Sequence, residues 1–235
     1  MSNERDLESY SKDGRIFQIE YAMKASNLGT TTLAITSKNS TILISEKKII
    51  SKLQNASTLR KHYKIYDNIA MSYSGIGSDA KSIIQKAREF CLNHERIYNE
   101  HPSLEGLLKY LCTLALKFGE KDMSRKIFAR PFGVNIVFAG YEDNMPVLYS
   151  FDPSGSYRRF KAKGIGGAAE AVEQELKEAY KSNLNEGAAI NMGLKLIKRV
   201  MKDNICRENV EICTVSESGV DFFPIDKVQQ HIEQL

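Results

Sequence analysis

The sequence predicts an α+β fold in which two mainly antiparallel sheets pack together and are covered on the outside by helix pairs. The expected elements run in the order strands, two helices, strands, two helices, then a strand and a helix. A parallel doubly wound sheet would instead alternate strand and helix strictly. The 235 residues are 42% hydrophobic, which is enough for a large core, and no Pro/Gly/Ser-rich linker divides them. We therefore expect a single domain over residues 1–235.

The first expected element is a helix over residues 14–28. Ser11 can cap it, Asp13 suits its first turn and Gly29 can end it. Its apolar positions recur at helical spacing and include Ile16, Ile19 and Met23, with Phe17 and Tyr21 beside them. A lone N-terminal helix needs less apolar surface than this, so we expect a partner, which another subunit could supply.

Strands and two helices follow in the first half of the chain. Apolar, β-branched runs predict strands over 31–36, 41–45 and 69–74. Ser78 or Asp79 can then cap a long helix, and a second helix follows Ser103, with a stripe of leucines at positions i, i+3 and i+4. These helices would cover one face of a sheet.

The second half repeats this order. Strands are expected over 134–139, 147–151 and 157–162, with a tight turn at 152–155. The remaining expected elements are helices over 168–180 and 186–202, a strand over 210–215, an apolar run at 222–225 and a short C-terminal helix.

Charge and composition narrow the functional classes. The formal net charge is only +4, and basic and acidic residues alternate, so nucleic-acid binding gains little support. The N-terminus lacks an apolar secretory segment, and no stretch is long enough to span a bilayer. We expect a protein of the cytoplasm and nucleus with no membrane partner.

Neither cysteines nor histidines are spaced as metal ligands. The four cysteines, Cys91, Cys112, Cys206 and Cys213, lie within helix or strand patterns and are expected to be buried reduced thiols. The four histidines, His62, His94, His101 and His231, form no metal-binding motif, and His94 and His101 are expected to be exposed near a helix end. We expect neither a metal nor a cofactor.

Two further patterns have a functional and an ordinary interpretation. Residues 164–169 match a dinucleotide fingerprint, but two helices follow instead of a strand, which favours a simple turn into a helix. Lys61 follows the second strand; it is either an ordinary solvated lysine or a group that captures the C-terminal carboxylate of a partner.

Residues 10–25 closely resemble the N-terminal signature of α-type proteasome subunits. Further segments resemble landmarks of that family in their usual order, namely 130–134, 138–140, 152–155 and 162–166. Residues 209–215, together with 130–134, are most similar to the fifth type of eukaryotic α subunit. The resemblance covers nearly the whole chain.

This resemblance implies a four-layer α-β-β-α sandwich of the N-terminal-nucleophile hydrolase type. It also implies a non-catalytic place in a seven-membered ring that stacks on a catalytic β ring, acts in ubiquitin-dependent degradation and admits unfolded substrates through a gate. Residues 1–13 would form the gate tail and turn, and Lys61 would receive the C-terminal tails of regulatory ATPases or other activators. The gate and ring contacts implied by the resemblance are Asn3, Glu4, Tyr10, Lys12, Gly14 and Tyr21.

The gate segment departs from the family pattern. Where the family has a Tyr-Asp pair, this chain has Asn3 and Glu4. Where the family has a proline in the reverse turn, this chain has Lys12. Loss of proline frees φ, and loss of tyrosine removes a ring that could stack and hydrogen-bond. We hypothesise that this chain contributes weakly to an ordered open gate.

An enzymatic alternative rests on residues 29–35, which are similar to the cleavage junction of catalytic β subunits. Thr30 would be the nucleophile with its own α-amine as base, Glu46 its acidic partner, and Lys61 or His62 would stand near the family's lysine. The helix ahead of Thr30, the longer side chain of Glu46 and the missing serine at 164–167 favour an ordinary first strand instead.

Overall fold

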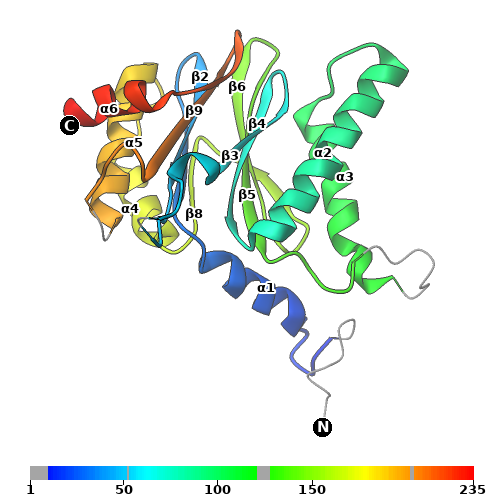
Figure 1. The fold of residues 1–235 in the computed structure, drawn as a ribbon. Coiled ribbons are helices and arrows are strands. Elements are labelled where there is room, and N and C mark those ends of the chain that lie inside the picture. Colours follow the sequence, from blue (N-terminus) through cyan, green and yellow to red (C-terminus); the bar gives the residue numbers. More distant parts are fainter. Residues whose placement is uncertain (1–9, 52, 121–127, 202–203) are drawn as a thin grey trace.

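The computed structural model describes residues 10–51, 53–120, 128–201 and 204–235. Two five-stranded antiparallel sheets lie face to face between two layers of helices (Figure 1). The predicted α+β sandwich is thereby confirmed.

The first sheet has the strand order β10-β9-β2-β1-β8. Its pairing is antiparallel throughout, and Ala34 lies opposite Leu43 at its centre. Its strands are β1 (Thr32–Thr36), β2 (Ser40–Glu46), β8 (Ala162–Ile165), β9 (Val210–Ser216) and β10 (Gly219–Phe222).

The second sheet has the order β3-β4-β5-β6-β7 and is also antiparallel. Its strands are β3 (His62–Tyr66), β4 (Ile69–Gly75), β5 (Val134–Glu142), β6 (Met145–Phe151) and β7 (Tyr157–Arg159).

Helices cover the outer face of each sheet (Figure 1). The second sheet packs against α2 (Gly77–Tyr98) and α3 (Leu104–Ala115), which continues into a 3₁₀ turn at Leu116–Gly119. The first sheet packs against α4 (Ala169–Ala179), α5 (Glu186–Val200) and α6 (Ile225–Glu233). The remaining helix, α1 (Phe17–Asn27), lies at one end of the sandwich, and a 3₁₀ turn occupies Ala56–Thr58.

Strand periodicity separates the core into three layers. Side chains of a strand alternate between its two faces. In β1, Leu33 and Ile35 therefore point to the helices α4 and α5, whereas Ala34 points to the other sheet. In β5, Phe138 packs under α2 and α3, and Val137 lies between the sheets. Small residues between the sheets allow close stacking, and larger ones fill the space beneath the helices.

The N-terminal helix is shorter than the one predicted over residues 14–28. It begins at Phe17, and its N-cap residue Ile16 makes no side-chain cap. Ser11 was expected to cap it, but its Oγ instead accepts hydrogen bonds from the amides of Asp13 and Arg15, 3.3 and 3.1 Å away. Serine offers the backbone a turn as readily as a helix cap, and the turn forms here.

The strand predicted over residues 157–162 is two strands in different sheets. The amide of Phe160 donates a hydrogen bond to the carbonyl of Leu148, in the second sheet. The carbonyl of the next residue, Lys161, accepts one from the amide of Thr36, in the first sheet. The chain therefore crosses between the sheets at residues 160–161. Strand β3 was not anticipated from the sequence.

The cysteines are free thiols, as expected, but they are not all buried. Cys91 and Cys213 are buried and Cys112 is half-buried, whereas Cys206 is exposed. Burial raises the pKa of Cys91 to about 12, so that thiol is inert at neutral pH.

Within the described ranges, no three His, Cys, Asp or Glu side chains gather as a metal site would require. Nor does any helix in these ranges have the length and apolar character to cross a bilayer.

Gly75 marks a point where no side chain fits, and its replacement gives a first prediction. Its φ is +112°, and an added Cβ would lie 2.2 Å from the carbonyl oxygen of Gly133. We expect Gly75→Ala to lower the free energy of unfolding by more than about 1 kcal/mol. Gly119→Ala is the control, because an added Cβ there meets nothing within 4 Å; it should change stability by less than about 0.5 kcal/mol. Urea unfolding of the two variants measures this difference, and equal midpoints would contradict it.

Candidate functional site

The segment ahead of α1 forms a closed turn. The amide of Gly14 donates to the carbonyl of Ser11 at 2.9 Å, and the amide of Ser11 donates to the carbonyl of Arg15 at 2.8 Å. Gly14 has φ of +71°, which favours glycine. Lys12 is the second residue of this turn and is exposed. The turn therefore forms without the proline that the family pattern has there. Asn3 and Glu4 lie outside the described residues.

The helix α1 exposes much of its apolar surface. Only Ala22 and Ser26 are buried in it. Tyr21 stacks on Phe17 with ring centres 6.2 Å apart, and remains 45% exposed. Tyr10 is also exposed, at 73%. This surface fits the expectation that α1 needs a partner.

Lys61 is buried. It is 6% exposed, its Nζ donates to the carbonyl of Tyr73 at 2.6 Å, and the ammonium lies 4.5 Å from the centre of the Tyr73 ring. The interpretation as an ordinary solvated lysine is therefore wrong. Burial lowers the pKa of Lys61 to about 8, against smaller raising effects of Glu211 and Glu46. Its described contacts do not join it to Tyr10 or Tyr21.

Next to Lys61, His62 belongs to a buried polar network that joins the two sheets. Its Nε2 lies 2.7 Å from Ser45 Oγ, which in turn lies 2.7 Å from Thr32 Oγ1 and 3.0 Å from Ser72 Oγ. Burial lowers the pKa of His62 to about 3, so the ring is neutral near pH 7. The network links side chains of β1, β2, β3 and β4.

Thr30 has no free amine, because α1 and Gly29 precede it in the chain. The Glu46 carboxylate accepts a hydrogen bond, at 3.4 Å, from the amide of Thr31, the residue after Thr30. Without that free amine, the Thr30 hydroxyl lacks the base that the β-type alternative requires.

The glycine-rich residues 164–169 serve packing. Gly166 has φ of +99°, and an added Cβ would lie 2.6 Å from the carbonyl oxygen of Thr30. The amide of Gly167 donates to the carbonyl of Gly29 at 3.0 Å, and that of Ala168 to Thr31 Oγ1 at 3.3 Å. These amides are engaged within the chain, so the turn interpretation is favoured over a dinucleotide site.

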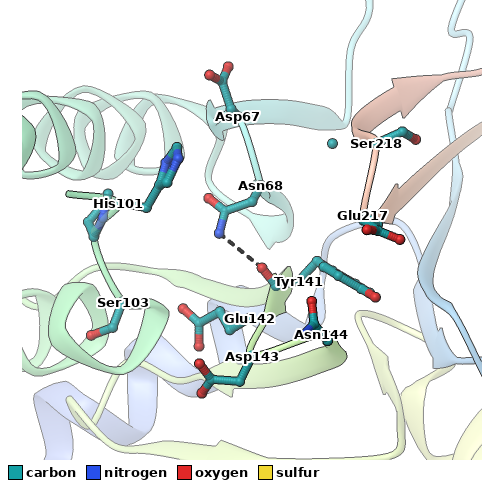
Figure 2. Close-up of a pocket in the computed structure, with 12 residues that line it drawn as sticks. Asp67, Asn68, His101, Ser103, Tyr141, Glu142, Asp143, Asn144, Glu217 and Ser218 are labelled. Atoms are coloured by element: carbon teal, nitrogen blue, oxygen red, sulfur yellow. Dashed lines mark hydrogen bonds between the residues drawn. The ribbon is translucent and has the colours of Figure 1, made fainter.

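A pocket of about 510 Å³ lies at the end of the sandwich opposite α1 (Figures 1 and 2). It is formed by the turns at 67–68, 143–144 and 217–219 and by residues 101–103 before α3. Figure 2 shows Asn68 donating its side-chain amide to the carbonyl of Tyr141, at 3.0 Å. None of the residues singled out in the sequence as gate, docking or catalytic candidates lines this pocket. Because its lining comes from separate turns, local patterns give no signal for it.

Two family models together match most of the chain. The model of the proteasome subunit family matches residues 26–215, and the model of the N-terminal signature of A-type proteasome subunits matches residues 4–25. The chain belongs to the α-type proteasome subunits. The N-terminal signature coincides with the turn and with most of α1, and it does not favour the β-type alternative at Thr30.

Relatives of this family also indicate the subtype. A probable alpha type-5 proteasome subunit of Encephalitozoon cuniculi (strain GB-M1) is 46% identical over 228 residues, covering 97% of this chain and 98% of the relative. The alpha type-5 proteasome subunit of Drosophila melanogaster is 37% identical over 99% of this chain and 96% of its own length. The protein of that name from Trypanosoma brucei brucei is 35% identical, with 98% and 95% covered. The predicted similarity to the fifth α type is confirmed.

The depressed pKa of Lys61 gives a second prediction. Lysine has an ordinary pKa near 10.5, and here it is about 8 when folded. Between these two pKa values, Lys61 is protonated in more of the unfolded molecules than of the folded ones. The free energy of unfolding therefore rises as the pH increases through this range. Relative to Lys61→Met, we expect the wild type to gain about 2 kcal/mol between pH 7.5 and 9.5.

Urea unfolding of both proteins at each pH measures that gain. Lys38→Met is the control, because Lys38 is exposed, and its difference from the wild type should not change with pH. A pH-independent difference for Lys61→Met would show that the buried ammonium has its ordinary pKa.

Proposed function

We propose that this chain is a non-catalytic subunit of the α ring of the proteasome core particle. In this role it contacts neighbouring α and β subunits, docks regulatory particles and restricts the passage of unfolded substrates, in the cytoplasm and the nucleus. The observation that carries the proposal is the intact turn and helix over residues 10–27 ahead of Thr30, within the α-type N-terminal signature.

The exposed apolar surface of the N-terminal region supports a ring position. Tyr10, Tyr21 and Leu28 are 73%, 45% and 88% exposed. Large apolar side chains that stay exposed along one segment of a chain are typical of an interface. Contacts with neighbouring ring subunits would remove it from water.

The proposed docking of activator tails at Lys61 requires a local change. In the isolated subunit, the carbonyl of Tyr73 holds the ammonium at 2.6 Å. A C-terminal carboxylate would be a stronger, charge-assisted acceptor than this carbonyl. We infer that an activator tail binds by replacing the Tyr73 carbonyl as the acceptor of the Lys61 ammonium.

The mature N-terminus tests the central proposal. We expect mass spectrometry of the native chain, purified within its complex, to find residues 2–29 retained, because α1 is packed on the sheets and the α-type signature lies in it. Electron microscopy of the same complex should place the chain in the outer ring. A mature chain that begins at Thr30 would instead support the threonine peptidase.

The absent turn proline gives a prediction about the gate segment. Proline suits the second position of a turn and reduces the freedom of the unfolded segment. In Lys12→Pro, we expect the Gly14 amide to exchange about two- to fivefold more slowly with deuterated solvent than in the wild type.

Lys12→Ala is the matched control, because it removes the side chain without fixing φ, and it should exchange like the wild type. Equal exchange in Lys12→Pro and Lys12→Ala would contradict the idea that free φ loosens this turn. A structure of the activated ring with Asn3 and Glu4 locked against a neighbouring turn would contradict the weak contribution to the open gate.

A further inference from the structure

The carboxylate of Asp79 holds together two segments that are far apart in the sequence. Asp79 lies in the first turn of α2, and its side chain is 13% exposed. Its Oδ2 accepts from Arg130 Nη1 at 2.7 Å and from the amide of Gly133 at 2.9 Å, and its Oδ1 accepts from Arg130 Nη2 at 3.1 Å. Two-pronged arginine–carboxylate pairs fix orientation as well as distance. The segment that leads into β5 is therefore fixed on α2.

The fixed segment in turn meets the end of β4. The amide of Ile76 donates to the carbonyl of Gly133 at 3.0 Å. Gly75 lies so close that an added Cβ would be 2.2 Å from that same carbonyl oxygen and 2.9 Å from the Cα of Ser26. Gly75 and Gly133 thus form a seat, made of the end of β4 and the start of β5, with no spare room.

The C-terminal half of α1 rests on this seat. The hydroxyl of Ser74 donates to the carbonyl of Ser26 at 2.9 Å, and Asn135 Nδ2 donates to Asn27 Oδ1 at 3.0 Å. A Cβ added at Gly133 would lie 3.6 Å from the Cβ of Ala25. The first half of α1 points away from the sheets (Figure 1), where Tyr21 is 45% exposed. The seat therefore supports the helix at one end only.

We propose that Asp79 and Arg130 are positioning residues for the turn over residues 10–16, because they fix the seat of α1 and so determine where this turn lies. This inference rests on the proposed role in the α ring. A helix of 11 residues is about 16 Å long, so a rotation of about 5° at the seat displaces the far end by about 1.4 Å. A displacement of that size would take a hydrogen-bonding group of residues 10–16 out of reach of a partner on a neighbouring subunit.

Core particles assembled with Asp79→Asn test the proposal. This variant keeps an acceptor for the Gly133 amide and loses the charge that holds Arg130. Peptide hydrolysis is measured in the latent particle and again after a low concentration of detergent has opened the gate. We expect the ratio of latent to opened activity to rise at least twofold, with the opened activity unchanged, since a purely structural defect would alter assembly and opened activity instead.

Two further variants make the result specific. Glu175→Gln removes a surface ion pair between α4 and α5, in which Glu175 lies 2.6 Å from Arg199. This variant should leave the ratio of latent to opened activity unchanged. Arg130→Lys keeps the charge but loses the two-pronged geometry, and it is tested in the same way if Asp79→Asn does not assemble. A wild-type ratio in an assembled Asp79 or Arg130 variant would overturn the inference.

A particle whose copy of this chain lacks residues 2–9 separates the two proposals. If this deletion leaves the ratio unchanged, the gate role itself fails, and hydrogen exchange then decides the positioning role. In Asp79→Asn particles, the amides of residues 19 and 20, which donate to the carbonyl of Ile16, should exchange at least threefold faster than in the wild type, while those of α4 should not change. Unchanged exchange at residues 19 and 20 would overturn the positioning role whatever the activity.

Discussion

The close approach of backbone segments at Gly29, Gly75 and Gly166 is the constraint on which the rest of the molecule depends. An added Cβ at Gly29 would lie 2.2 Å from the amide nitrogen of Gly75, and one at Gly166 would lie 2.6 Å from the carbonyl of Thr30. At this junction, the end of α1, the start of β1 and the ends of β4 and β8 meet around the small side chain of Ser74. The junction ties α1 to both sheets at once, and it places Thr30 inside a continuous, packed chain.

Beside this junction, the inter-sheet space contains polar side chains that hydrogen-bond to one another. Ser45, His62 and Ser72 bond across the sheets, and His62 is held neutral by burial. Unpaired polar groups are costly in such a place, so hydrogen bonding between the strands makes their burial tolerable. Membership of the α-type proteasome subunits implies assembly with other subunits, and the exposed side of α1 is the surface that neighbouring subunits would cover.

Much of the fold could be predicted because the local signals agreed with one another. The second helix of the first pair begins at Leu104, directly after Ser103 as expected, and the strands expected over 31–36 and 134–139 are present as β1 and β5. The failures came where tertiary contacts overrode a local preference. Ser11 caps a turn and leaves the helix uncapped. The strand expected over 157–162 divides because its two ends pair with different sheets. Cys206 is exposed although it was assigned to the interior.

The sequence by itself determined the α+β class, the order of most elements and membership of the α-type subunits, because periodicity and the residues 10–25 are local properties. Only the tertiary structure decided the surroundings of Lys61, His62 and Asp79, since their partners Tyr73, Ser45 and Arg130 come from other strands and loops. A lysine in sequence looks solvated, and only packing reveals that its ammonium is buried against a carbonyl and a ring. The pocket at the far turns was likewise not predictable from local patterns, because three separate hairpins and the residues before α3 form it together.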